Sequence, residues 1–130
     1  MDRKNVGGTP KIIGKILIAC GDEVCRSKLL NVISGKGLYL NSVWEDADLL
    51  LEVLDRDYDV IVYDLDISDF NGLKMVRIIR KIRRKVSLMV ISKNPSNELG
   101  GKVLQEGIAF HAVKPIDLAE VEEALFTLLN

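Results

Sequence analysis

The sequence has 130 residues, of which 48% are hydrophobic and 28% charged, and its formal net charge is -1 at pH 7. This length favours one domain with a buried core, and no apolar run reaches the roughly 20 residues that cross a bilayer. The balanced charge gives no general attraction to nucleic acid or membranes, and the amino terminus lacks the apolar stretch of a secretory signal. We therefore expect a single cytoplasmic domain without a direct nucleic-acid or membrane partner.

Short apolar segments alternate with amphipathic ones along the chain. Residues 1–14 contain several glycines and a proline, which is typical of a mobile leader, so we place the folded domain at residues 15–130. The expected strands are residues 15–20, 38–44, 60–64, 87–92 and 108–113. After each of them, hydrophobic residues recur every three or four positions, as on the buried side of a helix. This alternation predicts an α/β fold in which helices cover both faces of a five-stranded parallel sheet, a three-layer sandwich.

Two of the expected helices carry apolar residues that bear on packing and association. In the second helix we assign the buried face to Ala47, Leu50, Leu51 and Leu54. In the last helix a complete buried stripe is accompanied by additional apolar residues such as Phe126. Surplus apolar surface on a small protein usually marks an interface. We therefore expect a homodimer, or a docked partner, on a face formed by the helix within residues 94–107, the strand 108–113 and the last helix.

Polar residues stand at the ends of three expected strands. Asp64 ends the third strand, Ser92 ends the fourth, and Lys114 follows the fifth. The carboxyl ends of parallel strands meet at one edge of the sheet, where open α/β proteins bind ligands. Taken alone, Asp64 is either a candidate nucleophile, metal ligand or general base, or a solvated aspartate at a strand end. An acid, a hydroxyl and a lysine at successive strand ends together favour a functional site.

These residues and their context resemble the receiver domain of two-component response regulators. Asp64 ends the motif V-I-V-Y-D, Gly72 lies in N-G-L, and Lys114 precedes a proline. The resemblance implies a flavodoxin-like (βα)5 fold with strand order 2-1-3-4-5. It also implies that Asp64 is the phosphoacceptor and that Ser92 and Lys114 stabilise the phosphoryl oxygens. The implied partner is a sensor histidine kinase or a phosphotransfer protein.

The resemblance also suggests a conformational switch. His111 occupies the position at which the family has an aromatic residue that rotates inward when the hydroxyl residue moves. Ser92 and His111 are therefore assigned to the switch. The alternative for His111 is an ordinary, half-exposed strand histidine.

One departure from the family pattern concerns magnesium. The family ends its first strand with a pair of acidic residues, whereas this sequence has Cys20 and Gly21 there and keeps only Asp22. The other candidate ligands are Asp64 and the backbone carbonyl of Asp66, whose side chain could also contribute. Magnesium prefers near-octahedral ligation by oxygen atoms, so we expect Mg²⁺ to bind weakly.

This departure leaves several functional interpretations. The first is a signalling receiver that accepts a phosphoryl group on Asp64 with an impaired or altered magnesium site. The second is a pseudo-receiver that works without phosphorylation, by docking to a protein or pairing with itself. A shifted register, in which Asp22 and Glu23 form the acidic pair, is a further alternative. A small flavodoxin-like enzyme is disfavoured because only Gly21 follows the first strand, where a glycine-rich phosphate loop is needed. We therefore expect a signalling module that is not an enzyme.

The cysteines and the basic residues have simpler interpretations. Cys20 and Cys25 are too few for a zinc site, and we interpret them as small buried hydrophobic residues. The basic residues of the third helix and its end are Arg77, Arg80, Lys81, Arg83, Arg84 and Lys85. Cations are favourable near a helix carboxyl terminus, so a solvated face explains them. The alternative is a docking surface for an acidic partner.

Overall fold

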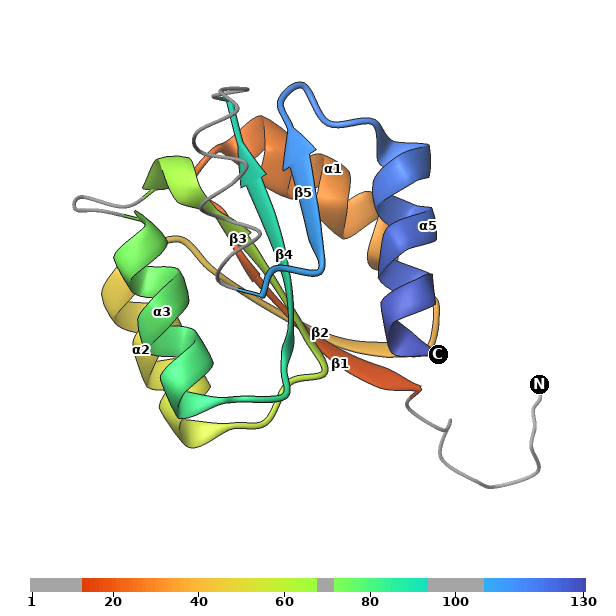
Figure 1. The fold of residues 1–130 in the computed structure, drawn as a ribbon. Coiled ribbons are helices and arrows are strands. Elements are labelled where there is room, and N and C mark those ends of the chain that lie inside the picture. Colours follow the sequence, from red (N-terminus) through yellow and green to blue (C-terminus); the bar gives the residue numbers. More distant parts are fainter. Residues whose placement is uncertain (1–12, 68–71, 94–106) are drawn as a thin grey trace.

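The computed structural model of the chain describes residues 13–67, 72–93 and 107–130. These residues form one sheet of parallel strands in the order β2-β1-β3-β4-β5 (Figure 1). The strands are β1 (Gly14–Ala19), β2 (Leu38–Val43), β3 (Val60–Asp64), β4 (Ser87–Ser92) and β5 (Phe110–Val113). The predicted α/β fold and strand order are therefore confirmed.

Helices cover both faces of this sheet. They are α1 (Glu23–Ile33), α2 (Asp46–Asp55), α3 (Gly72–Ile82) and α5 (Leu118–Leu129), and a short 3-10 helix, η1 (Leu65–Ile67), follows β3. Helices α1 and α5 pack on one face, and α2 and α3 lie side by side on the other (Figure 1). None of the helices in the described ranges is long and apolar enough to cross a membrane. The predicted helix within residues 94–107 and residues 1–12 of the predicted leader lie outside the described residues.

The core has two halves because alternate residues of the central strands point to opposite faces of the sheet. Val60 and Val62 of β3 pack with α1 and α5, whereas Ile61 and Tyr63 pack with α2 and α3. Every residue of β3 is buried, which explains the continuous apolar run in the sequence. This buried strand holds its final residue, Asp64, in a fixed position at the carboxyl edge of the sheet.

The buried face of α2 differs from the predicted one. Leu49 and Val53 are fully buried, whereas Leu51 and Leu54 are each 57% exposed. Three consecutive leucines at positions 49–51 span most of the circumference of a helix, so periodicity alone allowed more than one rotation. Ala47 is exposed as well. The assignment of Ala47, Leu51 and Leu54 to the core is therefore wrong, and α2 presents a second apolar side to solvent.

Polar contacts fix the rotation of α2 about its axis. The Glu52 carboxylate accepts hydrogen bonds from Asn41 Nδ2 (2.9 Å) and from the Tyr58 hydroxyl (2.6 Å). Asn41 belongs to β2, the strand at the sheet edge, so Glu52 turns toward that edge. Leu54 lies roughly 160° around the helix from Glu52 and therefore faces the α3 side.

Arg80 in the basic run is bound to the backbone of other segments. Its guanidinium group donates to the carbonyl oxygens of Arg84 (2.9 Å), Val86 (2.6 Å) and Gly107 (3.1 Å). The Arg84 and Val86 carbonyls lie between α3 and β4, and the Gly107 carbonyl lies before β5. All three are outside the helices and strands. Arg80 therefore joins two connections at the amino edge of the sheet, the one between α3 and β4 and the one before β5.

Arg83 has a similar role at the end of α2. Its guanidinium group donates to the carbonyl oxygens of Val53 (2.9 Å) and Leu54 (3.3 Å), and it forms an ion pair of 2.7 Å with Asp57. The last carbonyls of a helix have no partner within the helix, so a cation there satisfies them and complements the helix dipole. The interpretation of the whole basic run as a solvated or docking face is therefore wrong for Arg80 and Arg83.

The start of β1 and the end of α5 lie next to each other. A Cβ atom on Gly14 would come within 2.6 Å of Leu129 Cδ2, so the glycine permits this close approach. The neighbouring Ile13 donates its N–H to the Gly37 carbonyl (2.9 Å). Both ends of the described domain thus meet at the amino edge of the sheet, opposite to Asp64.

Candidate functional site

Asp64 is a buried carboxylate at the carboxyl edge of the sheet, and its side chain is 0% exposed. Its Oδ2 atom accepts hydrogen bonds from Lys114 Nζ (2.7 Å) and from the Cys20 thiol (3.4 Å). Its Oδ1 atom accepts from the Asp66 N–H (2.9 Å). These three hydrogen bonds satisfy the buried carboxylate and hold it in one orientation.

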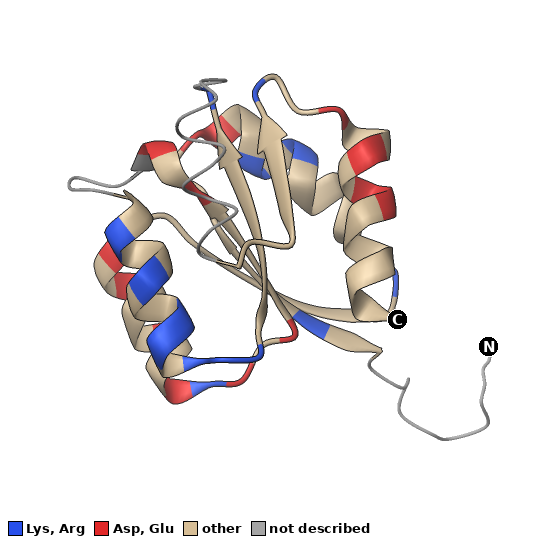
Figure 2. Cartoon of the chain, in the orientation of Figure 1, with Lys and Arg blue, Asp and Glu red and all other residues tan. Residues whose placement is uncertain are grey.

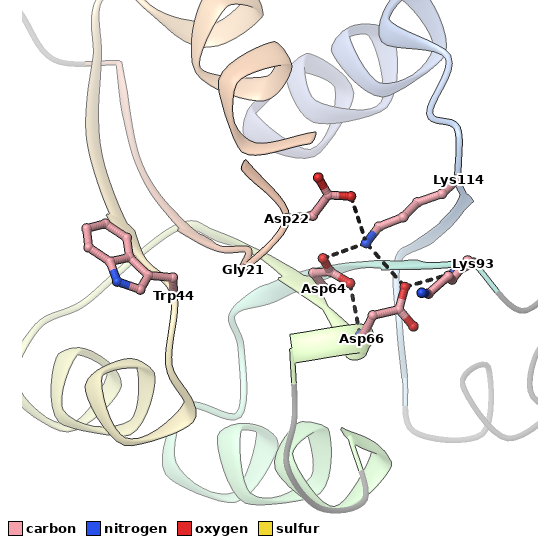
Figure 3. A pocket seen from close by; sticks show the side chains of 7 residues that line it. All are labelled: Gly21, Asp22, Trp44, Asp64, Asp66, Lys93 and Lys114. Atoms are coloured by element: carbon pink, nitrogen blue, oxygen red, sulfur yellow. Dashed lines mark hydrogen bonds and ion pairs between the residues drawn. The ribbon is translucent and has the colours of Figure 1, made fainter. Parts of the chain in front are cut away.

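Lys114 is the cation at the centre of the site. Its Nζ atom lies 2.7 Å from Asp64, 3.2 Å from Asp66 and 3.5 Å from Asp22, and its side chain is only 13% exposed (Figure 3). Burial alone would lower the pKa of Lys114, but hydrogen bonds and charges from Asp64 and Asp66 outweigh it, so the pKa is raised. The ammonium group therefore remains charged and joins three carboxylates. The peptide bond between Lys114 and Pro115 is cis.

Asp22 has two roles, at the start of α1 and at the site. As the predicted N-cap, its Oδ1 atom accepts from the N–H groups of Val24 (3.0 Å) and Cys25 (3.2 Å). The Cys25 hydrogen bond and the Lys114 charge both lower its pKa. Its other carboxylate oxygen faces Lys114, which links the helix to the site. Glu23 is the first residue of α1 and does not line the pocket, so the shifted register is not supported.

A pocket of about 440 Å³ opens over these charges (Figure 3). It is lined by Gly21, Asp22, Trp44, Asp64, Asp66, Lys93 and Lys114. Lys93 contributes through its backbone, because its N–H donates to Asp66 Oδ2 (3.1 Å). Sequence reasoning did not single out Lys93, although its place directly after β4 put it at the same edge. The pocket therefore combines three carboxylates with cationic groups at the predicted location.

Ser92 and His111 form a second polar pair on the neighbouring strands β4 and β5. The Ser92 hydroxyl lies 2.9 Å from His111 Nε2, and Ser92 is 1% exposed. Burial lowers the pKa of His111, so the ring is neutral near pH 7. The Ser92 carbonyl also accepts the Lys114 N–H (2.8 Å). The two predicted switch residues are thus in contact, and their backbone connects them to Lys114.

Cys20 contacts the site directly, which sequence reasoning missed. Like Cys25, it is a free, buried cysteine, as predicted. Its thiol, however, donates toward Asp64 Oδ2 (3.4 Å) and the Asp22 carbonyl (3.4 Å). A hydrogen bond with Cys25, burial and the charge of Asp64 raise the pKa of Cys20. The thiol therefore stays protonated, and it takes the space beside Asp64 where the family pattern has an acid.

The predicted metal ligands come together around one cation. Asp22, Asp64 and Asp66 all direct oxygen atoms to the Lys114 ammonium group. The nearby Cys20 thiol is protonated and soft, whereas magnesium requires hard oxygen ligands in near-octahedral geometry. Within the described ranges, no cluster of acidic, histidine or cysteine side chains is arranged to hold a metal ion.

Comparison with known proteins gives a consistent picture. The sequence profile described as "Response regulator receiver domain" matches residues 16–126. The "DNA-binding transcriptional regulator NtrC" of Azospirillum brasilense is 28% identical over 115 residues, which cover 88% of this chain and 24% of that protein. The "Transcriptional regulatory protein CusR" of Escherichia coli K12 is 29% identical over 116 residues, covering 79% of this chain and 51% of that protein. The chain thus spans about a quarter to a half of these relatives.

Solved structures share the fold. A two-component response regulator from Clostridium difficile superposes with a TM-score of 0.83 at 21% identity, covering 89% of this chain and 95% of that one. A CheY-like receiver domain protein from Methanospirillum hungatei JF-1 gives a TM-score of 0.82 at 16% identity, covering 89% and 93%. Because the profile match spans most of the chain and agrees with the strand order, the chain belongs to the response regulator receiver domain family.

Proposed function

We propose that this chain is a cytoplasmic two-component receiver module that accepts a phosphoryl group on Asp64 from a sensor histidine kinase or phosphotransfer protein. Support comes from one observation: a buried, oriented carboxylate lies beneath an open pocket with an ammonium group 2.7 Å from its Oδ2 atom. In the transfer, an Asp64 oxygen attacks phosphorus, and the bond from phosphorus to the donor histidine breaks. Lys114 stabilises the charge that develops on the phosphoryl oxygens.

The test of this proposal is phosphorylation by a small-molecule donor. Incubation with acetyl phosphate and magnesium should add the mass of one phosphoryl group to the intact protein. The Asp64→Asn variant should show no gain in mass, because an amide lacks the carboxylate oxygen that acts as the nucleophile. Intact-protein mass spectrometry provides the measurement. A modified Asp64→Asn variant would show that another residue is the acceptor.

Receiver domains generally bind Mg²⁺ in their acidic pocket, and we propose that this chain binds it much more weakly than usual. Lys114 already forms ion pairs with the three carboxylates, and Cys20 and Gly21 supply no acid. Gly21→Asp adds a carboxylate at the pocket wall and should tighten Mg²⁺ binding by roughly tenfold. Trp44 lines the same pocket and is 56% exposed, so its fluorescence can report the titration.

The matched control for this titration is Gly21→Asn. Asparagine has nearly the same size as aspartate but lacks its charge, so it should leave the Mg²⁺ affinity close to that of the unmodified protein. Calorimetry provides a second measurement that does not depend on Trp44. Ordinary receiver affinity in the unmodified protein would contradict the proposal.

A second candidate function is a pseudo-receiver that acts by docking without phosphorylation. The observation that favours it is the standing contact of Lys114 with three carboxylates, which stabilises a single arrangement of the site without phosphate. Absence of any mass gain with acetyl phosphate, together with a folded domain, would favour this function over the first.

We also propose docking or pairing through the face formed by β5, α5 and the helix that the sequence predicts within residues 94–107. A groove of about 330 Å³ between β5 and α5 supports it, with Phe110, Ala124 and Leu128 in its lining. The sequence predicts Phe126 on this face, but it was not found there, since Lys36 Nζ is 5.7 Å from the centre of its ring. Lys36 follows α1, so Phe126 faces the α1 side.

A further inference from the structure

Helices α2 and α3 carry equal and opposite charge. The sequence of α2 contains the acids Asp46, Asp48, Glu52 and Asp55 and no base, whereas α3 contains the bases Lys74, Arg77, Arg80 and Lys81 and no acid. Figure 2 shows the acidic residues of α2 beside the basic residues of α3 on one side of the molecule. The outer face of these two helices therefore has an acidic half and a basic half.

Four charges of α2 and α3 point outward and form no ion pair among the described residues. Asp48 and Asp55 on α2 and Lys74 and Lys81 on α3 are all exposed. In the part of the chain that the structure describes, no ion pair joins these residues to each other or to another side chain. In contrast, Glu52 is bound at the β2 edge. The four outward charges are thus available to a partner.

An apolar strip lies between the two sets of charges. Leu51 and Leu54 of α2 are each 57% exposed, and Ile78 of α3 is 36% exposed. Leu54 faces α3 because Glu52, two residues earlier, turns toward β2. By the same geometry Ile78 faces α2, because Arg80, two residues later, turns toward Val86 and Gly107 on the other flank.

Spacing along each helix places the charges on the outer sides of this strip. Asp48 and Asp55 are three residues before and four residues after Leu51, and Lys74 and Lys81 are four before and three after Ile78. With 3.6 residues per turn, Asp48 and Asp55 lie roughly 40–60° around α2 from Leu51, on the side away from Leu54. Lys74 and Lys81 lie roughly 40–60° around α3 from Ile78, on the side away from the buried residues of that helix. The order across the surface is therefore an acidic row, an apolar strip and a basic row.

We propose that two copies of this chain associate face to face through α2 and α3. Both helices follow strands of one parallel sheet by the same type of crossover, so they run in the same direction. A two-fold axis parallel to the helices and along the apolar strip then places α2 of each copy on α3 of the other. The acidic row of one copy meets the basic row of its partner twice, and the apolar strips cover each other.

The second copy is the occupant that the charges specify. A partner of a single charge would match one row and repel the other, whereas an identical face satisfies both rows at once. The apolar strip consists of few residues, so the association is weak and depends on salt. This interface involves neither the pocket above Asp64 nor the groove between β5 and α5, so it is independent of the proposed function.

Charge reversal with mixing tests the proposal by sedimentation over a wide concentration range. The variant Asp48→Lys/Asp55→Lys has two basic rows, and Lys74→Glu/Lys81→Glu has two acidic rows. Each alone should self-associate at least tenfold more weakly than the unmodified chain, because like charges then face each other. An equimolar mixture of the two should form a heterodimer at least as readily as the unmodified chain forms its homodimer, since every row finds its opposite.

The matched control is Glu23→Lys/Lys28→Glu, which reverses two exposed charges on α1, on the other side of the sheet, and should leave association unchanged. Thermal melts of each variant should show a folded domain, because the substituted residues are exposed. A strictly monomeric unmodified chain at all concentrations would overturn the proposal. So would reversed variants that associate normally, or a mixture that associates no better than its components.

Discussion

Replacing Lys114 with alanine should lower the free energy of unfolding by about 1–3 kcal/mol. The ammonium group lies within 3.5 Å of carboxylate oxygens of Asp22, Asp64 and Asp66. Without it, three negative charges share one small region, and Asp64 is fully buried. Losing one partner of a buried pair costs more than the pair contributed, because the remaining charge has no compensation. Denaturant unfolding of the variant and the unmodified protein measures the loss.

A second substitution separates the charge effect from lost packing. Adding Asp64→Asn to Lys114→Ala removes the buried negative charge and should recover a large part of the stability. Lys93→Ala is the matched control, because Lys93 contacts Asp66 through its backbone N–H, which alanine keeps. It should change the free energy of unfolding by less than about 0.5 kcal/mol. If Asp64→Asn fails to recover stability, Lys114 does not act as the counterion of Asp64.

Arg80→Ala should also destabilise the domain, by about 1–3 kcal/mol. The guanidinium group donates to three backbone carbonyls, those of Arg84, Val86 and Gly107. Alanine leaves all three without this donor. Because these carbonyls belong to two connections, one before β4 and one before β5, the variant should also loosen the amino edge of the sheet, which hydrogen exchange can detect at Val86 and Gly107.

Two controls make this prediction specific to the guanidinium geometry. Arg80→Lys keeps the charge but cannot reach three carbonyls at once with a single nitrogen atom, so it should restore only part of the stability. Lys81→Ala removes the adjacent, exposed cation and should be nearly neutral. Equal losses in Arg80→Ala and Lys81→Ala would show that the general charge of α3 matters, and not the contacts of Arg80.

The fold and the location of the site could be predicted because both depend on local patterns. Buried parallel strands appear in the sequence as continuous apolar runs, and their carboxyl ends share one edge of the sheet. The proximity of Asp64 and Lys114 could therefore be predicted. The rotation of α2 could not be predicted, because three consecutive leucines fit more than one buried face. It is decided by Glu52, whose partners Asn41 and Tyr58 lie outside the helix, one on each side of it in the sequence.

The contacts between side chains could also not be predicted from the sequence. The sequence pattern around Cys20 is that of a small buried hydrophobic residue, whether or not its thiol contacts Asp64. The contact depends on the pairing of β1 with β3. Arg80 gives the same signal as the solvated lysine beside it, since both are basic residues near a helix end. Distinguishing them requires knowing where the Val86 and Gly107 carbonyls lie.

The contact between Gly14 and Leu129 has a consequence for chain architecture. A domain whose two ends lie close together can be inserted into a surface loop of a host protein without forcing the two sides of that loop apart. For the same reason, a short linker from Leu129 to Gly14, with new ends opened at an exposed connection, would give a circular permutant that preserves the sheet. The graft point lies at the edge of the sheet opposite to Asp64, so such rearrangements leave the chemistry of the pocket untouched.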